Sequence, residues 1–172
     1  MQQSDEWSGS ELLMGALAGA AAGALAVWVM DRVDWTAYRH EAEQTRAKTV
    51  AARPEGMDPA HVLANTFANR VGKDVKQPSV AGIGTHYAIG ILPGALYGML
   101  HDRVPGLSAG RGGLFGLGLF LLQDELFNTI TGLSGKPRQY PWQAHARGAG
   151  AHLVYGLTTD AALRLFKRML GR

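Results

Sequence analysis

The segment from Gly112 to Thr131, GGLFGLGLFLLQDELFNTIT, places the strongest constraint on how the chain can fold. It begins as a membrane-spanning helix would, because Gly112 to Leu122 carries no charge. Gln123, Asp124 and Glu125 then follow within the same apolar stretch. A carboxylate at the depth of the hydrocarbon is costly, so such residues face a bundle interior, a partner or a water-filled cavity. The segment therefore predicts a membrane helix with a polar layer near one end.

Three further apolar stretches have lengths that suit a bilayer, for which a helix needs ~20 apolar residues. We expect an all-α, integral membrane bundle of four transmembrane helices in one domain, 1–172. The expected spans are 12–30, 79–100, 112–131 and 148–166, the last within a long helix from Trp142 to Arg172. Two alternatives stay open: a cleaved signal peptide at 12–30, which the acidic start disfavours, and a soluble helical protein.

A hydrophilic loop, 31–78, separates the first two spans and holds eight of the 17 basic residues. Its Asp34–Lys48 region predicts a charged surface helix. Asp58-Pro59 is a good helix start, so His61–Val71 is expected to form a short amphipathic helix that lies on the membrane or packs on the bundle. His40 and His61 are expected to be solvated.

Glycines recur at every fourth position in the first two spans, which gives each span one smooth face. We expect these faces to pack against helices, either within the chain or in a homo-oligomer or membrane partner protein. The residues are Gly15, Gly19 and Gly23 in the first span, and Gly90, Gly94 and Gly98 in the second.

Composition excludes several classes of function. The chain has no cysteine, so disulfides, thiolate metal sites and thiol catalysis are ruled out. The net charge is only +3 without a long basic run, so nucleic acid is not an expected partner, and the lipid bilayer is. Counting Lys and Arg by side favours external termini, with eleven basic residues inside and six outside. The basic C-terminal end argues for the opposite orientation.

Helix registers bring several polar residues to one depth. His86, Asp124, Glu125 and His152 each lie ~10 Å from the same membrane face if the spans are antiparallel. Asn128 stacks on Asp124 at i+4 and completes the candidate polar layer. Neighbouring side chains expected to support the layer are His145, Arg147, Tyr155 and Asp160. Because Asp124 and Glu125 point in different directions, one of them should pair with Arg147, His145 or His152.

The layer has one structural and two functional interpretations, and an enzyme is not expected because no catalytic motif is recognised. The polar groups could serve only to specify helix packing. They could instead form a proton- or ion-linked site for a pH response or transport, since imidazole and carboxylate titrate when burial shifts them. A divalent metal or haem held by His86, His152 and a carboxylate is a further alternative, although no tight ligand motif supports it and no cofactor is predicted.

Several segments in order resemble the YagU-like family of bacterial inner-membrane proteins. They are the Gly-rich first span, MDPAHVLAN, GTHYAIGILPGALYG, GLFLLQDE and YPWQAHARGAGAHLVYG. The resemblance is clearest from Met57 to Thr159. It implies a multi-pass protein of the bacterial inner (cytoplasmic) membrane and supplies no assigned catalytic residues. The acidic N-terminus departs from the basic N-termini of some members.

Overall fold

Helices form every regular element in the part of the chain that the computed structural model describes, which is residues 8–169 and 171. The expectation of an all-helical fold is confirmed. Arg172, the end of the expected last helix, lies outside the described residues. In chain order the elements are α1 (Gly9–His40), α2 (Glu43–Ala52), η1 (Pro54–Gly56), α3 (Pro59–Asn69), α4 (Val80–Leu100), α5 (Gly113–Leu119), η2 (Phe120–Phe127), α6 (Asn128–Ile130), η3 (Pro137–Gln139) and α7 (Trp142–Met169).

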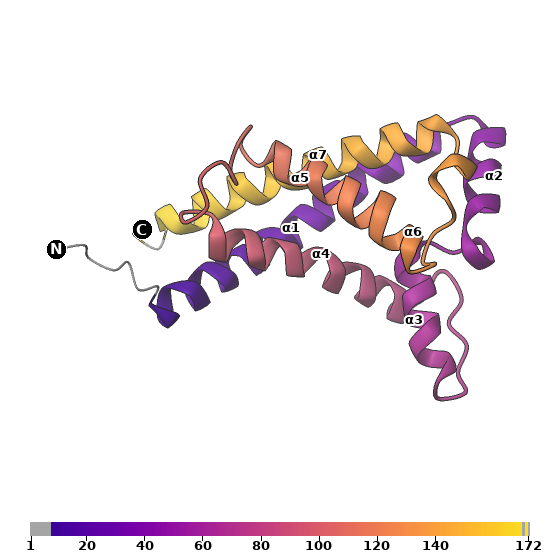
Figure 1. The fold of residues 1–172 in the computed structure, drawn as a ribbon, viewed down its shortest axis with the longest axis horizontal. Coiled ribbons are helices and arrows are strands. Elements are labelled where there is room, and N and C mark those ends of the chain that lie inside the picture. Colours follow the sequence, from indigo (N-terminus) through magenta and orange to yellow (C-terminus); the bar gives the residue numbers. More distant parts are fainter. Residues whose placement is uncertain (1–7, 170, 172) are drawn as a thin grey trace.

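The long helices run antiparallel in an elongated bundle (Figure 1). α1 packs against α4 and α7, α5 packs against α7, and α3 packs against α4. The first turns of α1 and the last turns of α7 meet at one end, which we call the terminal end. α2, α3 and α6 gather at the other, which we call the loop end. The polar segments 41–79 and 131–141 therefore lie together at the loop end.

α1 continues for ten residues past Met30, where the apolar run that predicted it ends, and stops at His40. The expected Asp34–Lys48 helix is instead divided between the end of α1 and α2. Arg46 explains the break, since its Nη1 donates to the carbonyl oxygens of Arg39 and Glu41, at 3.1 and 2.9 Å. The extension adds two acidic side chains, Asp31 and Asp34, to α1 toward the loop end of the bundle.

The third expected span is helical from Gly113 to Ile130, but its centre, η2, is a π-helix. The N–H of Asn128 donates to the carbonyl oxygen of Gln123, five residues earlier, instead of four. This wide turn holds Gln123, Asp124 and Glu125, and π-turns within α-helices are often found at functional sites. Hydrophobic periodicity gave no indication of it.

The two glycine rows lie against each other, so the backbones of α1 and α4 are in contact. A Cβ added at Gly19 would lie 2.3 Å from the carbonyl oxygen of Gly94 and 2.8 Å from Cα of Gly98. At Gly94 it would lie 2.7 Å from Cα of Gly23. Both faces are thus occupied inside the chain. A second such contact, not expected from the sequence, brings Gly116 of α5 against Gly156 of α7.

His61 corrects an expectation, because it is buried (5% exposed) and not solvated. Asp58 caps α3 by accepting the His61 N–H at 3.0 Å, and its Oδ2 lies 2.9 Å from His61 Nδ1. The His61 Nε2 accepts the N–H of Ser79 at 3.2 Å, at the start of α4. The ring also covers Gly82, where an added Cβ would collide with it at 2.1 Å. α3 is therefore fastened to α4.

Small and polar residues make up much of the interior, together with Val27, Tyr97 and Leu163, while many large apolar residues lie outside. Ala22, Ala26 and Thr159 are completely buried, whereas Leu92 and Leu114 are 64% and 62% exposed. Among the described residues one helix, α1, is both long and apolar enough to cross a membrane. Helix α4 has the length, but its glycines, His86 and Pro93 make it less apolar.

The glycine contact generates a stability prediction for two positions in α4. We expect Gly94→Val to destabilise the protein by about 3 kcal/mol or more, because overpacking at a closed contact costs about 1–3 kcal/mol and here the opposing atoms are backbone. Gly84→Val is the matched control, since no atom lies within 4 Å of a Cβ added at Gly84. Thermal unfolding in detergent measures both. Equal midpoints for the two variants would contradict a closed helix contact.

Candidate functional site

A polar layer crosses the bundle near its loop end, where side chains from α1, α4, η2 and α7 pair across helices. His86 of α4 lies with Nε2 2.9 Å from Oδ1 of Asp31 on α1. Asp31 lies just beyond the predicted end of the first span, so the sequence analysis had placed it in the loop. The glycine contact between the two helices brings the pair into register. His86 is thereby held on the α1 side of the layer.

Arg147 of α7 ties this helix to the extension of α1. Its Nη1 donates to Oδ1 of Asp34 at 2.5 Å, and its Nε donates to Oε1 of Glu41 at 2.8 Å. The guanidinium is 10% exposed and contacts both carboxylates, so α7 is paired with two acidic side chains at the end of α1. Glu41 Oε2 is a buried oxygen without a hydrogen-bond partner among the described residues.

Glu125 and His145 form the closest imidazole–carboxylate pair in the layer, with Nδ1 2.6 Å from Oε1. The other ring nitrogen, Nε2, lies 3.0 Å from the carbonyl oxygen of Pro137. A carbonyl oxygen only accepts, so Nε2 carries a hydrogen. Nδ1 and Oε1 would then present two lone pairs to each other unless a proton lies between them. A proton shared between Nδ1 and Oε1 would satisfy both atoms while Nε2 donates to Pro137.

Asp124 and His152 occupy the other side of η2. Asp124 Oδ1 accepts from Nδ2 of Asn128 at 3.4 Å, and its Oδ2 lies 3.7 Å from Nδ1 of His152. The same Nδ1 lies 3.0 Å from the carbonyl oxygen of Gly148, to which it donates. In a neutral ring Nε2 is then the nitrogen with a free lone pair. His152 is nearly buried (6% exposed).

A small cavity of about 40 Å³ lies beside this group, lined by His86, Gln123, His152, Tyr155 and six apolar or glycine neighbours. Its volume exceeds the ~10–15 Å³ that one water requires. The Tyr155 hydroxyl donates to the carbonyl oxygen of Gly90 at 2.6 Å, across from α7 to α4. The cavity therefore offers polar side chains from α4, η2 and α7 to a single small occupant.

The predicted layer residues lie at the loop end of the bundle, in pairs that cross between helices. His86 and His152 line the cavity, Asp124 lies 3.7 Å from His152, and Asn128 is stacked on Asp124. Glu125 turns to His145. Arg147, an expected partner of the carboxylates on the third span, binds α1 instead. One sequence feature could have predicted this contact. It is the acidic pattern Asp31, Asp34 and Glu41, which falls on one face if the first helix is extended past Met30.

Asp160 does not support the layer, because it belongs to a separate network at the terminal end. It is 2% exposed and accepts from the Tyr97 hydroxyl and from Nε of Arg164, both at 2.7 Å. Nε2 of His101 lies 3.1 Å from Asp160, and Nδ1 lies 2.6 Å from Asp102. His101 was not among the predicted site residues, although its spacing from Tyr97 puts both on one face of α4.

Lys167 extends this network to the surface by donating to Asp102 Oδ2 at 2.5 Å. Burial raises the pKa of the Asp102 carboxyl, but hydrogen bonds from Lys167 and His101 outweigh burial and hold it below its usual range. The ionised carboxylate thus joins α7 to the turn after α4. Loss of this contact is expected only as the pH falls into the acid range, through the lowered pKa.

The described residues include no group of three or more His, Asp or Glu side chains placed to hold a metal ion. The two histidines considered as ligands have other contacts: His86 with Asp31, and His152 with the carbonyl oxygen of Gly148.

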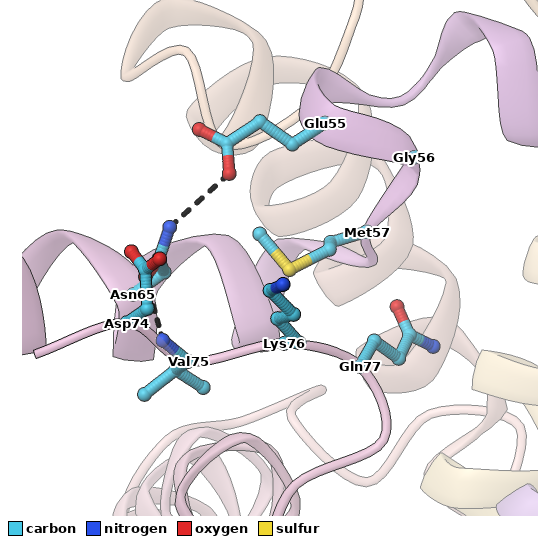
Figure 2. A pocket seen from close by; sticks show the side chains of 8 residues that line it. All are labelled: Glu55, Gly56, Met57, Asn65, Asp74, Val75, Lys76 and Gln77. Carbon is cyan, nitrogen blue, oxygen red and sulfur yellow. Dashed lines mark hydrogen bonds between the residues drawn. The ribbon is translucent and has the colours of Figure 1, made fainter.

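A larger pocket of about 420 Å³ lies at the loop end, outside the layer (Figure 2). Its lining comes from 55–57, Asn65 and 74–77. Asn65 donates to Glu55 at 3.1 Å and accepts the N–H of Val75 at 2.9 Å, so its amide holds two walls together. The sequence analysis had not singled out this pocket.

Comparison with known proteins gives no relative, since no protein-family model, no curated protein and no solved structure matches the chain.

The layer generates a prediction for Arg147. We expect Arg147→Met to destabilise the protein by about 3 kcal/mol, because removing one partner of a buried ion group leaves charge uncompensated. Arg147→Lys should recover part of this loss. Arg138→Met is the control, because Arg138 is exposed. Denaturation in detergent compares the three, and an Arg147→Met protein as stable as the control would contradict the role of Arg147.

Proposed function

We propose that this chain is a four-span inner-membrane protein whose polar layer takes up and releases protons. The distribution of side chains supports the membrane location. In water, most large apolar residues are buried, but here several leucines of α4, α5 and α7 lie outside, among them Leu92, Leu114 and Leu165, while the closest helix contacts are made by alanine and glycine. Close small-residue contacts with an apolar exterior are typical of membrane bundles.

Helix lengths support four spans rather than one. Helix α4 has 21 residues, α5 to α6 together run from 113 to 130, and α7 has 28 residues. At 1.5 Å per residue these correspond to about 32, 27 and 42 Å, against a hydrocarbon core of about 30 Å. The resemblance to the YagU-like family agrees with a bacterial inner membrane as the location.

The charge balance of the layer supports proton exchange. Five carboxylates, 11% to 36% exposed, belong to it: Asp31, Asp34, Glu41, Asp124 and Glu125. Arg147 is the permanent cation in contact with them, and the other partners are His86, His145 and His152. Uncompensated charge in a membrane interior is costly, so protons on these imidazoles or carboxylates must offset the excess.

The contacts of His145 carry the proposal most directly. Its two ring nitrogens face only acceptors, a carboxylate and a carbonyl. A proton shared between His145 and Glu125 is one that such a pair can bind and release as the pH changes. Proton-linked transport and a response to pH both use such a site.

A structural role is the second candidate, and the Arg147 contacts favour it. A guanidinium that bridges Asp34 and Glu41 fixes α7 against α1 whether or not protons move. The glycine faces, by contrast, are occupied within the chain and leave no room there for a partner helix. If this role is correct, the layer tolerates neutral substitutions at its histidines.

The absence of cysteine allows a clean test of the four spans. Single cysteines at exposed loop positions, Lys73→Cys, Val104→Cys and Arg138→Cys, are labelled in intact cells with a membrane-impermeant maleimide. We expect the cysteines at 73 and 138 to be either both labelled or both unlabelled, and the cysteine at 104 to give the opposite result. Three equal accessibilities would leave α1 as the one span and contradict the four-span proposal.

The proton role is tested by flux in proteoliposomes under a pH gradient. We expect His145→Gln, Glu125→Gln, His86→Gln and His152→Gln each to lower proton flux at least severalfold, because each removes a titrating group from the layer. His40→Gln is the control, since His40 is exposed on α1. Absence of flux, or flux unchanged in all four variants, would refute the proton role and leave the structural one.

A further inference from the structure

The outer face of α3 is held in a fixed position at the loop end. The inner face packs on the start of α4 through His61, which is hydrogen-bonded to Asp58 and Ser79 and covers Gly82. α3 projects from the bundle beside α4 (Figure 1). Because the inner face is fastened, the opposite face cannot turn inward.

That outer face presents apolar side chains next to a cation. Phe67 and Val71 are 57% and 72% exposed and lie four residues apart, on one side of the helix and its final turn. The Arg70 guanidinium lies over the Phe67 ring, 5.2 Å from its centroid. An amphipathic helix that lies in a membrane interface combines aromatic and aliphatic residues with basic ones in this way.

The charges around this face favour an anionic partner. Arg70, Lys73 and Lys76 are exposed within and after the last turn of α3, and Asp74 is the one acidic residue among 66–80. Positive-inside counting also assigns this loop to the cytoplasmic side, whose leaflet carries anionic lipids.

The apolar surface continues from α3 onto the bundle. Val80 and Ile83 in the first turn of α4 are 89% and 50% exposed, and Leu92 and Leu96 farther along are 64% and 54% exposed. The apolar exterior of α4 therefore begins where α3 is attached, which is the depth of a headgroup region if α4 spans the membrane.

We propose that the outer face of α3 docks on anionic lipid, with Phe67 and Val71 among the outermost acyl segments and Arg70 and Lys73 at the phosphates. This proposal rests on the membrane location proposed above. An acidic segment of a partner protein would satisfy the same charges but would not require the apolar continuity with α4, so lipid is the favoured occupant.

Fluorescence quenching in the reconstituted full-length protein tests the docking. A bimane label is placed at Val71→Cys, at Asn69→Cys on the opposite side of the helix, or at Leu92→Cys in the middle of α4. The vesicles contain phosphatidylcholine and phosphatidylglycerol, brominated either near the headgroup or deep in the acyl chain. We expect shallow bromines to quench the label at 71 strongly and the label at 69 weakly.

Charge is tested by adding Arg70→Gln and Lys73→Gln to the labelled Val71→Cys protein. Each substitution removes one positive charge and should reduce the ratio of membrane-docked to undocked α3 by roughly fivefold in anionic vesicles. Equal quenching in vesicles of phosphatidylcholine alone would overturn the anionic-lipid requirement.

The label at 92 distinguishes failure of the lipid-docking proposal for α3 from failure of the proposed membrane location. If deep bromines quench it while the label at 71 is unquenched, the bundle spans the membrane but α3 does not dock, which overturns the lipid proposal and favours an acidic protein partner. If the label at 92 is also unquenched, the membrane location itself fails.

Discussion

The contact between the backbones of α1 and α4 determines where every other polar group lies. Glycine on both sides lets the helices approach until Gly19 and Gly94 touch, and no larger residue fits there. This contact sets the register of α4 on α1 and brings His86 to Asp31. α7 packs against α1 and also contacts α4, and it adds Arg147, which reaches Asp34 and Glu41. Close packing and charge pairing thus reinforce each other at the loop end.

The resulting layer is rich in carboxylates. Among the described residues five carboxylates belong to it, and Arg147 is the permanent cation in contact with two of them. In the proposed account, the imidazoles offset the difference by binding protons. The π-turn of η2 contributes by directing Glu125 to His145 and Asp124 to His152. The terminal network differs, since Asp160 is already matched by Arg164, Tyr97 and His101.

Sequence patterns predicted the helical class and the positions of the four long helical segments, because apolar length and helix periodicity are local properties. They did not predict the partners of Arg147 and Asp160, which depend on how helices are rotated against one another. The continuation of α1 to His40 was missed because a hydropathy signal ends where charge begins, although the helix does not. The burial of His61 was not predicted either, because hydrophilicity marks 31–78 as a loop but does not reveal that a helix within this loop packs on α4.

The protonation state of the Glu125–His145 pair is the most direct test of the proposed proton site. Solid-state NMR of protein with ¹⁵N-labelled histidine, in bilayers at neutral pH, resolves protonated from unprotonated ring nitrogens, and His145→Gln assigns the signals. Infrared difference spectra against Glu125→Gln detect a protonated carboxyl. We expect His145 with both nitrogens protonated, or a neutral His145 with a protonated Glu125. A neutral His145 beside an ionised Glu125 would contradict the account.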